Sequence, residues 1–456
     1  MIARVEAVPV RKAGRLPGGL LELTALAYPA VLQTLSDTTM QVVDSAIVGR
    51  LGVVELGAVG FGGVWLWTML VLFIGTATGV QTFVSQAFGA RNTRECGRWV
   101  WQALYALLPV AVLWVGLMML LFAPLVHLLG PSPELQVLAT RYARARLCGA
   151  PALVGALVLT SFFRGIGDTR TPLAAAVAAN ILNAVCAYGL VFGRFGLPAW
   201  GVGGAGTATA LANWTYATIM LVAFLRSPMA DTYGTRPVAP QPEAMRRFAR
   251  TSVPVGGQWV LDMASFALFS TIIARMGDAA MAASQALIQL LSLSFMQAIG
   301  IAIASGALVG RYVGARDLAA AQRSHRSAMQ LGMGLAALVA ALFLTVPDTL
   351  LGVFTHDPEV LAIGRPLLAL GAAFQLLDAV QIIVGGALRG AGDTRWPFVV
   401  QASLAWCVRL PLVYLVAIVL RGGVTGAWLG ELGYVAVLGA TWLGRFHSGV
   451  WREIRI

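Results

Sequence analysis

Apolar stretches long enough to cross a lipid bilayer recur along the whole chain, separated by short polar segments. A helix needs about 20 apolar residues to span the hydrocarbon core. Twelve stretches meet this requirement, near residues 20–48, 54–86, 99–128, 136–162, 172–193, 201–225, 248–275, 279–310, 327–354, 360–388, 397–420 and 424–444. The pattern predicts an all-α integral membrane protein with twelve transmembrane helices, the first of them retained rather than cleaved as a signal peptide.

The second half of the chain repeats the first at a constant offset. The phrase RGIGDTRTP at 164–172 returns as RGAGDTRWP at 389–397, which is 225 residues later. The same offset joins four further pairs: Pro29 and Pro254, Gln33 and Gln258, Asp37 and Asp262, and Gly52 and Gly277. An ungapped match of this length indicates an internal duplication. Each copy holds six spans, an even number, so the copies are expected to form two pseudo-twofold-related six-helix bundles with the same orientation in the membrane.

This organisation divides the chain into five segments. The segment between the copies is polar and rich in proline, which is typical of a linker. The predicted parts are a cytoplasmic N-terminal segment (1–19), an N-lobe of spans 1 to 6 (20–225), a cytoplasmic linker (226–247), a C-lobe of spans 7 to 12 (248–445) and a cytoplasmic C-terminal tail (446–456).

Composition and charge agree with a membrane protein. Charged residues make up 11% of the chain and hydrophobic ones 58%, whereas soluble domains carry about 25% charged residues. Of the 32 Lys and Arg, 23 lie in the terminal segments and alternate loops, eight lie in the opposite loops, and Arg409 falls inside a span. Basic loops stay in the cytoplasm. We therefore expect cytoplasmic termini, an inner-membrane location and no nucleic-acid partner.

Four aspartates inside the predicted spans are the strongest functional signal. Asp37 and Asp44 share one face of span 1 because they are seven residues apart, Asp262 lies in span 7 and Asp378 in span 10. An ionised carboxylate at the bilayer centre costs about 2.5–3.5 kcal/mol or more, so such residues face the protein interior or a wet cavity. A carboxylate there can hold a proton or release it when a cation arrives. These four residues are the predicted cation-coupling groups.

Amide side chains in the same spans are candidates for the lining of a cavity or substrate site. They are Asn180, Asn183, Gln258, Gln285, Gln289, Gln375 and Gln381. For Gln285 and Gln289 the alternative is a purely structural bond between helices, and for Asp262 and Asp378 it is an internal polar network. A hard cation such as sodium prefers oxygen ligands, which Asp262 and Asp378 with neighbouring amide and backbone oxygens would supply. The four cysteines form no metal-binding motif.

These residues together resemble the multidrug and toxic compound extrusion (MATE) transporters of the multidrug/oligosaccharidyl-lipid/polysaccharide (MOP) exporter superfamily. The resemblance covers about residues 18–445. It rests on Pro29 with VVDSAIVGRLG (42–52), QAFGARN (86–92), the two RGxGDTRxP phrases and FQLLDAVQ (374–381). It implies two six-helix lobes around a V-shaped central cavity and export of lipophilic, often cationic compounds against an inward gradient of sodium ions or protons. We expect no cofactor beyond the coupling ion. We also expect the carrier to be a monomer.

Matching the family's motifs assigns roles to particular positions. The acids of spans 7 and 10 that bind the ion in the sodium-coupled bacterial branch match Asp262 and Asp378. Asp262 stands where that branch commonly has glutamate. The coupling acid of span 1 matches Asp44 and its span 5 partner matches Asn183, but the second polar partner is replaced by Ala187. Asn180, one turn earlier, can substitute for it.

Two alternatives follow from the same residues. A lipid-linked precursor flippase of the same superfamily would need a strongly cationic cavity, and Arg409 is the one basic residue predicted inside a span. An intramembrane aspartyl enzyme is suggested by the GxGD sequences that end in Asp168 and Asp393. Both aspartates precede Thr-Arg-x-Pro in basic loops, where the expected role is to cap the next helix or to pair with a nearby arginine. No ATP-binding or hydrolase motif is present in the sequence, so we expect a transporter and not an enzyme.

Overall fold

The computed structural model describes residues 16–130, 132–354 and 357–454. Most of the predicted N-terminal segment 1–19 and the end of the predicted tail therefore lie outside the described residues. Within them, nine helices are long and apolar enough to cross a membrane, or ten when the bent pair α5 and α6 counts as one crossing. With α1 and α17, which are 30 and 25 residues long and more polar, the structure contains the twelve predicted crossings.

Each lobe is a bundle of six crossings. The N-lobe consists of α1 (Leu20–Gly49), α2 (Val53–Thr78) continued by α3 (Val80–Gly89), α4 (Thr93–Leu129), α5 (Pro133–Leu147) with α6 (Ala150–Ile166), α7 (Arg170–Phe192) and α8 (Val202–Leu225). The C-lobe consists of α10 (Pro242–Ala274), α11 (Asp278–Gly314), α12 (Leu318–Thr345), α14 (Pro358–Ala391), the crossing built from α15 (Arg395–Leu404), η1 (Ala405–Arg409), α16 (Leu410–Tyr414) and η2 (Leu415–Val419), and α17 (Gly423–His447). Short helices α9 (Ser227–Tyr233), α13 (Pro347–Gly352) and η3 (Val450–Glu453) lie outside the crossings.

Proline and glycine mark several helix boundaries. Proline stands in the first turn of α5, α10 and α14, where its missing N–H would have had no partner. Glycines with φ between 68° and 92° follow α4, α7 and α14, a backbone conformation that disfavours other residues. The predicted linker 226–247 contains α9 and the first turns of α10, so it is more helical than its composition indicates.

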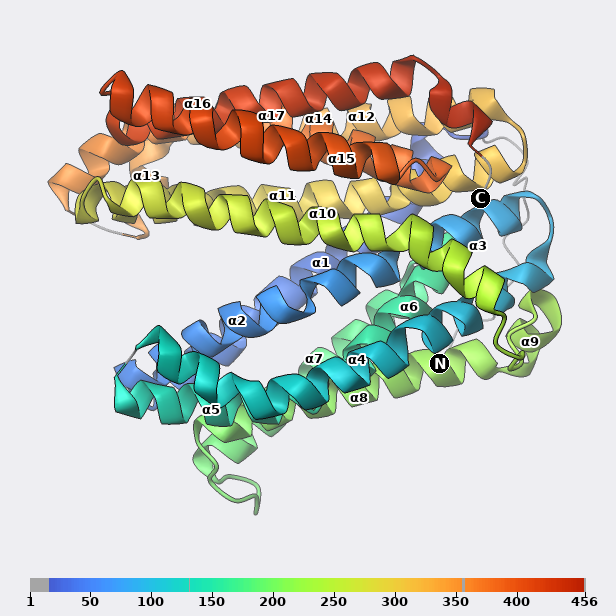
Figure 1. The fold of residues 1–456 in the computed structure, drawn as a ribbon, viewed down its shortest axis with the longest axis horizontal. Helices are drawn as coiled ribbons and strands as arrows, with labels where there is room; N and C mark the ends of the chain where they lie inside the picture. Colours follow the sequence, from blue (N-terminus) through green and yellow to red (C-terminus); the bar gives the residue numbers. More distant parts are fainter. Residues whose placement is uncertain (1–15, 131, 355–356, 455–456) are drawn as a thin grey trace.

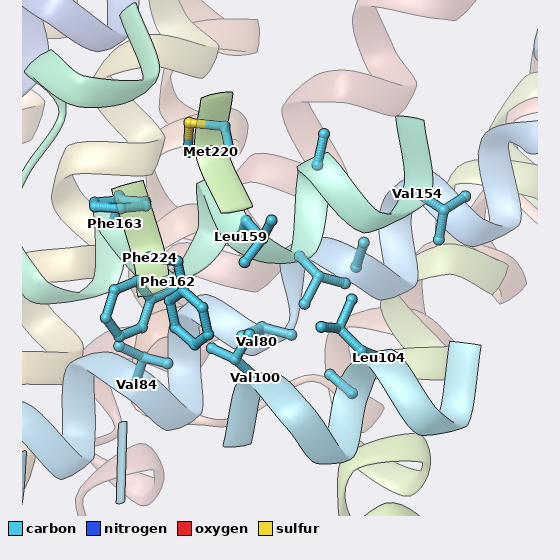
Figure 2. Packing of buried hydrophobic residues seen from close by; sticks show 14 of the residues in the cluster. Val80, Val84, Val100, Leu104, Val154, Leu159, Phe162, Phe163, Met220 and Phe224 are labelled. Atoms are coloured by element: carbon cyan, nitrogen blue, oxygen red, sulfur yellow. The ribbon is translucent and has the colours of Figure 1, made fainter. Parts of the chain in front are cut away.

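The interior of each lobe is filled with aliphatic and aromatic side chains. Figure 2 shows this packing in the N-lobe, where residues of α3, α4, α6 and α8 meet; the labelled ones are Val80, Val84, Val100, Leu104, Val154, Leu159, Phe162, Phe163, Met220 and Phe224. In the C-lobe, α11, α12, α14 and α17 form the corresponding cluster, and this cluster also includes Leu23 and Ala27 from the first turns of α1. The start of α1 thus packs in the core of the opposite lobe.

The two lobes form an open V and approach each other at the end that contains α3 (Figure 1). Small residues permit this approach: a Cβ atom on Gly75 of α2 would lie 2.6 Å from the Cα atom of Gly256 in α10. Side chains of α3 donate across the interface to carbonyl oxygens of the C-lobe, Gln81 to Ile303 at 2.8 Å and Thr82 to Arg389 at 2.8 Å. The second RGxGDTRxP phrase therefore begins in the contact between the lobes.

A polar cluster at the same end, which we call the clasp, joins α1 to α11. Glu22 accepts hydrogen bonds from the Tyr312 hydroxyl at 2.7 Å and from Arg311 at 3.4 Å. Arg311 also donates to the carbonyl of Ile166 at 3.2 Å, which lies within the first RGxGDTRxP phrase. Both copies of the phrase thus offer backbone oxygens to the opposite lobe.

Candidate functional site

The two acids of the first span contact the same neighbouring helix. The Asn180 amide on α7 donates to Asp37 Oδ1 at 3.3 Å and to the Ser36 hydroxyl at 2.9 Å. One turn further along α7, the Asn183 amide donates to both oxygens of Asp44, at 2.9 and 3.1 Å. The structure thus brings together the four polar residues that the sequence assigns to the N-lobe.

The Asn183 side chain retains unused hydrogen-bonding capacity. Asn183 is buried, and its carbonyl oxygen has no partner among the described atoms. Ala187, the position without the second polar group, is fully buried one turn beyond. A buried acceptor without a partner is costly. A proton held by Asp44, or a small cation beside it, would give this oxygen a partner.

A second N-lobe network was not anticipated from the sequence. Arg164 lies in the last turn of α6, and it donates to the Gln33 amide oxygen at 3.0 Å instead of pointing into the loop. The Gln33 amide nitrogen donates to the Tyr216 hydroxyl at 3.1 Å, which is 2.7 Å from the Thr160 hydroxyl. Arg164 was counted as a loop cation because its motif follows a span. Only the tertiary structure shows that its side chain turns inward.

Asp378 lies in the middle of α14 and is buried, with 5% of its surface exposed. The Gln381 amide donates to its Oδ1 at 2.7 Å. Gln375, one turn before, is also buried, and its amide nitrogen has no partner among the described atoms. These three polar residues of α14, which the sequence singled out, therefore lie together inside the C-lobe.

Asp262 of α10 has a different environment, because its neighbour is an arginine. One oxygen of Asp262 lies 3.5 Å from an Arg409 guanidinium nitrogen, and the Asp262 side chain is 39% exposed. Arg409 makes its shorter bonds to Glu431 of α17, at 2.7 and 2.6 Å, and to Ser265 at 2.8 Å. Arg409 and Glu431 are each 3% exposed. The C-lobe thus contains a buried bidentate ion pair next to a predicted coupling acid.

The surroundings of Arg409 stabilise its charge within the bundle. Its guanidinium carbon lies 5.1 to 5.8 Å from the ring centres of Phe266, Phe269 and Tyr434. Arg409 ends η1, a π-helical turn, and such turns often occur at functional sites. Glu431 was not among the residues predicted from the sequence. The rule that selected the four aspartates, an acid within a predicted span, would have found it in 424–444.

The predicted sodium ligands, Asp262 and Asp378, have nitrogen donors as their nearest described partners. Asp262 faces the Arg409 guanidinium and Asp378 accepts from the Gln381 amide. Sodium requires oxygen lone pairs, whereas these partners present N–H groups. No group of three or more His, Cys, Asp or Glu side chains suited to a metal ion occurs among the described residues. In the present arrangement the Arg409 guanidinium lies beside Asp262, so a sodium site shared by Asp262 and Asp378 requires Arg409 to move away.

The remaining glutamine candidates lie in two places. Gln258 is buried and donates to Gln401 of α15 inside the C-lobe. Gln285 and Gln289 are exposed on α11. They lie on the helix face that further along contacts the N-lobe, where the Met296 carbonyl accepts from Thr34 at 3.2 Å. Their position on this face directs them toward the space between the lobes.

The aspartates of the repeated phrases have local partners. Asp168 accepts from two backbone N–H groups in the first turn of α7, both at 3.0 Å, which is the predicted cap. Asp393 instead accepts from Arg445 at 2.8 Å. Neither aspartate has the environment of a catalytic pair: the first copy makes the predicted helix cap, and the second makes the predicted pair with a nearby arginine.

Comparison with known proteins identifies the relatives of the chain. The model of the MatE family matches residues 29–189 and 254–415, two segments that begin 225 residues apart, as the internal repeat does. The "probable multidrug resistance protein NorM" of Thermotoga maritima is 27% identical over 438 residues, which cover 95% of this chain and 93% of that protein. A protein of the same description from Xanthomonas axonopodis pv. citri is 30% identical over 412 residues, with 89% of each chain covered.

Solved structures show the same architecture. The Vibrio cholerae MATE transporter VcmN in the bent form matches with a TM-score of 0.85 and 20% identity over 95% of this chain and 98% of that one. A structure described as the outward-facing conformation of a multidrug resistance MATE family transporter of the MOP superfamily matches with a TM-score of 0.86 and 19% identity, over 97% and 100% of the two chains. These matches confirm the predicted fold class of twelve helices in two bundles.

Proposed function

The chain belongs to the MatE family, and from this premise we propose that it is a cation-coupled multidrug exporter. It would move lipophilic, often cationic compounds out of the cell in exchange for sodium ions or protons. The multidrug resistance proteins among its relatives support the substrate class. The observation that carries the coupling is the presence, in both lobes, of an in-span carboxylate bonded to an amide: Asp44 with Asn183, and Asp378 with Gln381.

The contacts between the lobes support a mechanism of alternating access. Every described side-chain hydrogen bond between the lobes involves N-lobe residues 17–34, 81–86 or 166, which lie in the half of the molecule that contains the clasp. Under the predicted topology this half is cytoplasmic, so the lobes part toward the outside. Cation occupancy would shift the balance of states only through a different affinity for each of them.

The distribution of basic residues supports the proposed location. This integral multi-pass membrane protein would lie in the bacterial inner membrane with both termini in the cytoplasm, because the basic residues gather on the loops of one side. A monomer suffices for this mechanism, since each chain contains both lobes.

Efflux from vesicles tests the proposal. A fluorescent lipophilic cation is loaded, and its export is measured under an imposed sodium gradient, an imposed pH gradient and no gradient. We expect export in the parent under at least one gradient, and a loss of this dependence in Asp44→Asn and Asp378→Asn. Asp231→Asn is the matched control, because Asp231 is an exposed acid outside the crossings with a long 3.7 Å contact to Arg236. Gradient-driven export that survives both in-span substitutions contradicts the coupling assignment.

The alternatives have less support in the described residues. A flippase for pyrophosphate-linked lipids would need free cationic groups in the cavity, but Arg409 is buried against Glu431 and is not available. An aspartyl enzyme would need two free aspartates within the bilayer, whereas Asp168 and Asp393 are occupied at span ends. The transporters among the chain's relatives also argue against an enzyme.

A further inference from the structure

A cavity of about 590 Å³ lies outside the coupling site, on the membrane face that carries the repeated phrases. Its walls come from the first turns of α10, the loop at 392–394, the start of α15 and Ile454 near the C-terminal end. Four arginines line it: Arg246, Arg247, Arg250 and Arg395. The mechanism proposed above does not use any of them.

The cavity carries an excess of positive charge. All four arginines are exposed, and none of them forms an ion pair among the described residues. Two acids also line the cavity. Asp393 is neutralised by Arg445 at 2.8 Å, so Glu243 is the one lining acid without such a partner in the described part of the chain.

The arginines are attached to segments that are fixed to each other. The Thr394 hydroxyl donates to the backbone carbonyl of Thr251 at 2.7 Å in a buried contact. Arg395 Nε donates to the backbone carbonyl of Arg250 at 3.4 Å. These two bonds join α10 to the start of α15 beneath the cavity, so its walls are preformed and an incoming ligand need not assemble them.

The duplication does not explain the cluster. At the offset of 225 residues, the counterparts of Arg246, Arg247 and Arg250 in the first repeat are Leu21, Glu22 and Ala25. The general excess of basic residues on one membrane face does not explain the cluster either. Other arginines of that face, such as Arg326, lie outside the cavity, so nothing in that excess requires four arginines to line it. The cluster is thus a specific feature of the C-lobe.

We propose that this cavity binds a phosphate-bearing anion at the membrane surface. Guanidinium groups bind phosphate oxygens in bidentate fashion and remain charged at any physiological pH. A basic cluster next to transmembrane helices attracts anionic lipid headgroups. The shared chemistry is a phosphate group, supplied either by an anionic phospholipid or by a free phosphate in solution.

Lipid binding to the purified full-length protein tests the proposal. Native mass spectrometry compares retention of phosphatidylglycerol with that of phosphatidylcholine, and a second arm titrates inorganic phosphate against bound phosphatidylglycerol. We expect the parent to retain phosphatidylglycerol preferentially. The variant R246Q/R250Q/R395Q should lose roughly fivefold in affinity for each arginine removed, on the order of 100-fold in total. The control R94Q/R316Q/R326Q removes the same charge outside the cavity and should bind as the parent does.

The outcomes separate the sources of phosphate and can overturn the proposal. Displacement of the lipid by inorganic phosphate identifies a general phosphate site, and retention in its presence identifies a headgroup site. If the parent shows no preference and binds no phosphate, or if the control loses as much affinity as the cavity variant, the proposal is wrong. Should the triple variant fail to fold, Arg246→Glu alone applies the same test, because the Arg246 side chain is exposed and makes no described contact.

Discussion

The two lobes arose from one repeated unit, yet equivalent acids have different surroundings in them. Asp37 in α1 and its counterpart Asp262 in α10 each face the fifth crossing of their own lobe. Asp37 meets a neutral amide there, Asn180, whereas Asp262 meets Arg409. Asp37 thus contacts a neutral group, whereas Asp262 lies beside an internal cation whose shorter bonds go to Glu431.

From this difference we expect the acids of the two lobes to contribute unequally to the proposed coupling. Asp44 and Asp378 are bonded to amides and form no ion pair among the described residues, which suits the uptake of a proton or a cation in the proposed coupling. A carboxylate beside a fixed guanidinium already has a partial counter-ion. We therefore expect coupling to depend most on Asp44 and Asp378. We expect the contribution of Asp262 to depend on the position of Arg409, which Glu431 fixes.

Breaking the C-lobe ion pair should have the largest effect. Glu431→Gln leaves Arg409 buried without its main partner, and removal of one member of a buried pair typically costs about 3–5 kcal/mol. We expect a lower unfolding temperature and loss of gradient-driven efflux. The double variant R409M/E431L removes both charges and should unfold near the temperature of the parent. A stable E431Q variant would show that Glu431 does not hold Arg409.

Substitution in the N-lobe should affect transport more than stability. Asp44→Asn keeps a side chain of the same shape beside Asn183 but cannot ionise. We expect a fall in gradient-driven efflux of about 5- to 150-fold, the range of coupling free energies of 1–3 kcal/mol, with little change in unfolding temperature. Asp37→Asn is the comparison on the same helix face and should have a smaller effect, since Asp37 is bonded by the longer 3.3 Å contact.

Weakening the clasp should shift the balance between conformations. Glu22→Gln removes a charge that bonds Tyr312 and Arg311 across the lobes, so the state with closed clasp becomes less populated. In a background in which the four native cysteines are replaced by serine, a cysteine at Ser45, exposed on the outer part of α1, should react more slowly with an impermeant maleimide in this variant. The exchange E22R/R311E should restore the rate. Equal rates in all three proteins would contradict a role of the clasp in the closed state.

The repeated phrases provide the smallest predicted effect. Asp168→Ala removes the cap of α7 and should destabilise the protein by about 1 kcal/mol, measured by thermal unfolding. Asp168→Asn retains an accepting oxygen and should be close to neutral. If the alanine and asparagine variants unfold alike, the cap contributes nothing measurable.

Much of this architecture could be predicted from the sequence, because hydrophobic length and duplication are local properties of the chain. The spans and the repeat depend on spacing along the chain, and the pairing of Asp44 with Asn183 was implied by the resemblance of their motifs to the MATE family. The inward turn of Arg164 and the partner of Arg409 could not be predicted, since both depend on how distant helices face each other. Glu431 was detectable as an acid within a span, but its pairing with a residue 22 positions earlier required the structure.

The ion pair between Arg409 and Glu431 also bears on how the chain is inserted into the membrane. Its two members belong to consecutive crossings, and each charge alone in hydrocarbon costs about 2.5–3.5 kcal/mol or more. Together they satisfy each other before either meets lipid. We expect the last two crossings to leave the translocon as one hairpin, and a chain truncated after residue 422 to integrate its eleventh crossing poorly.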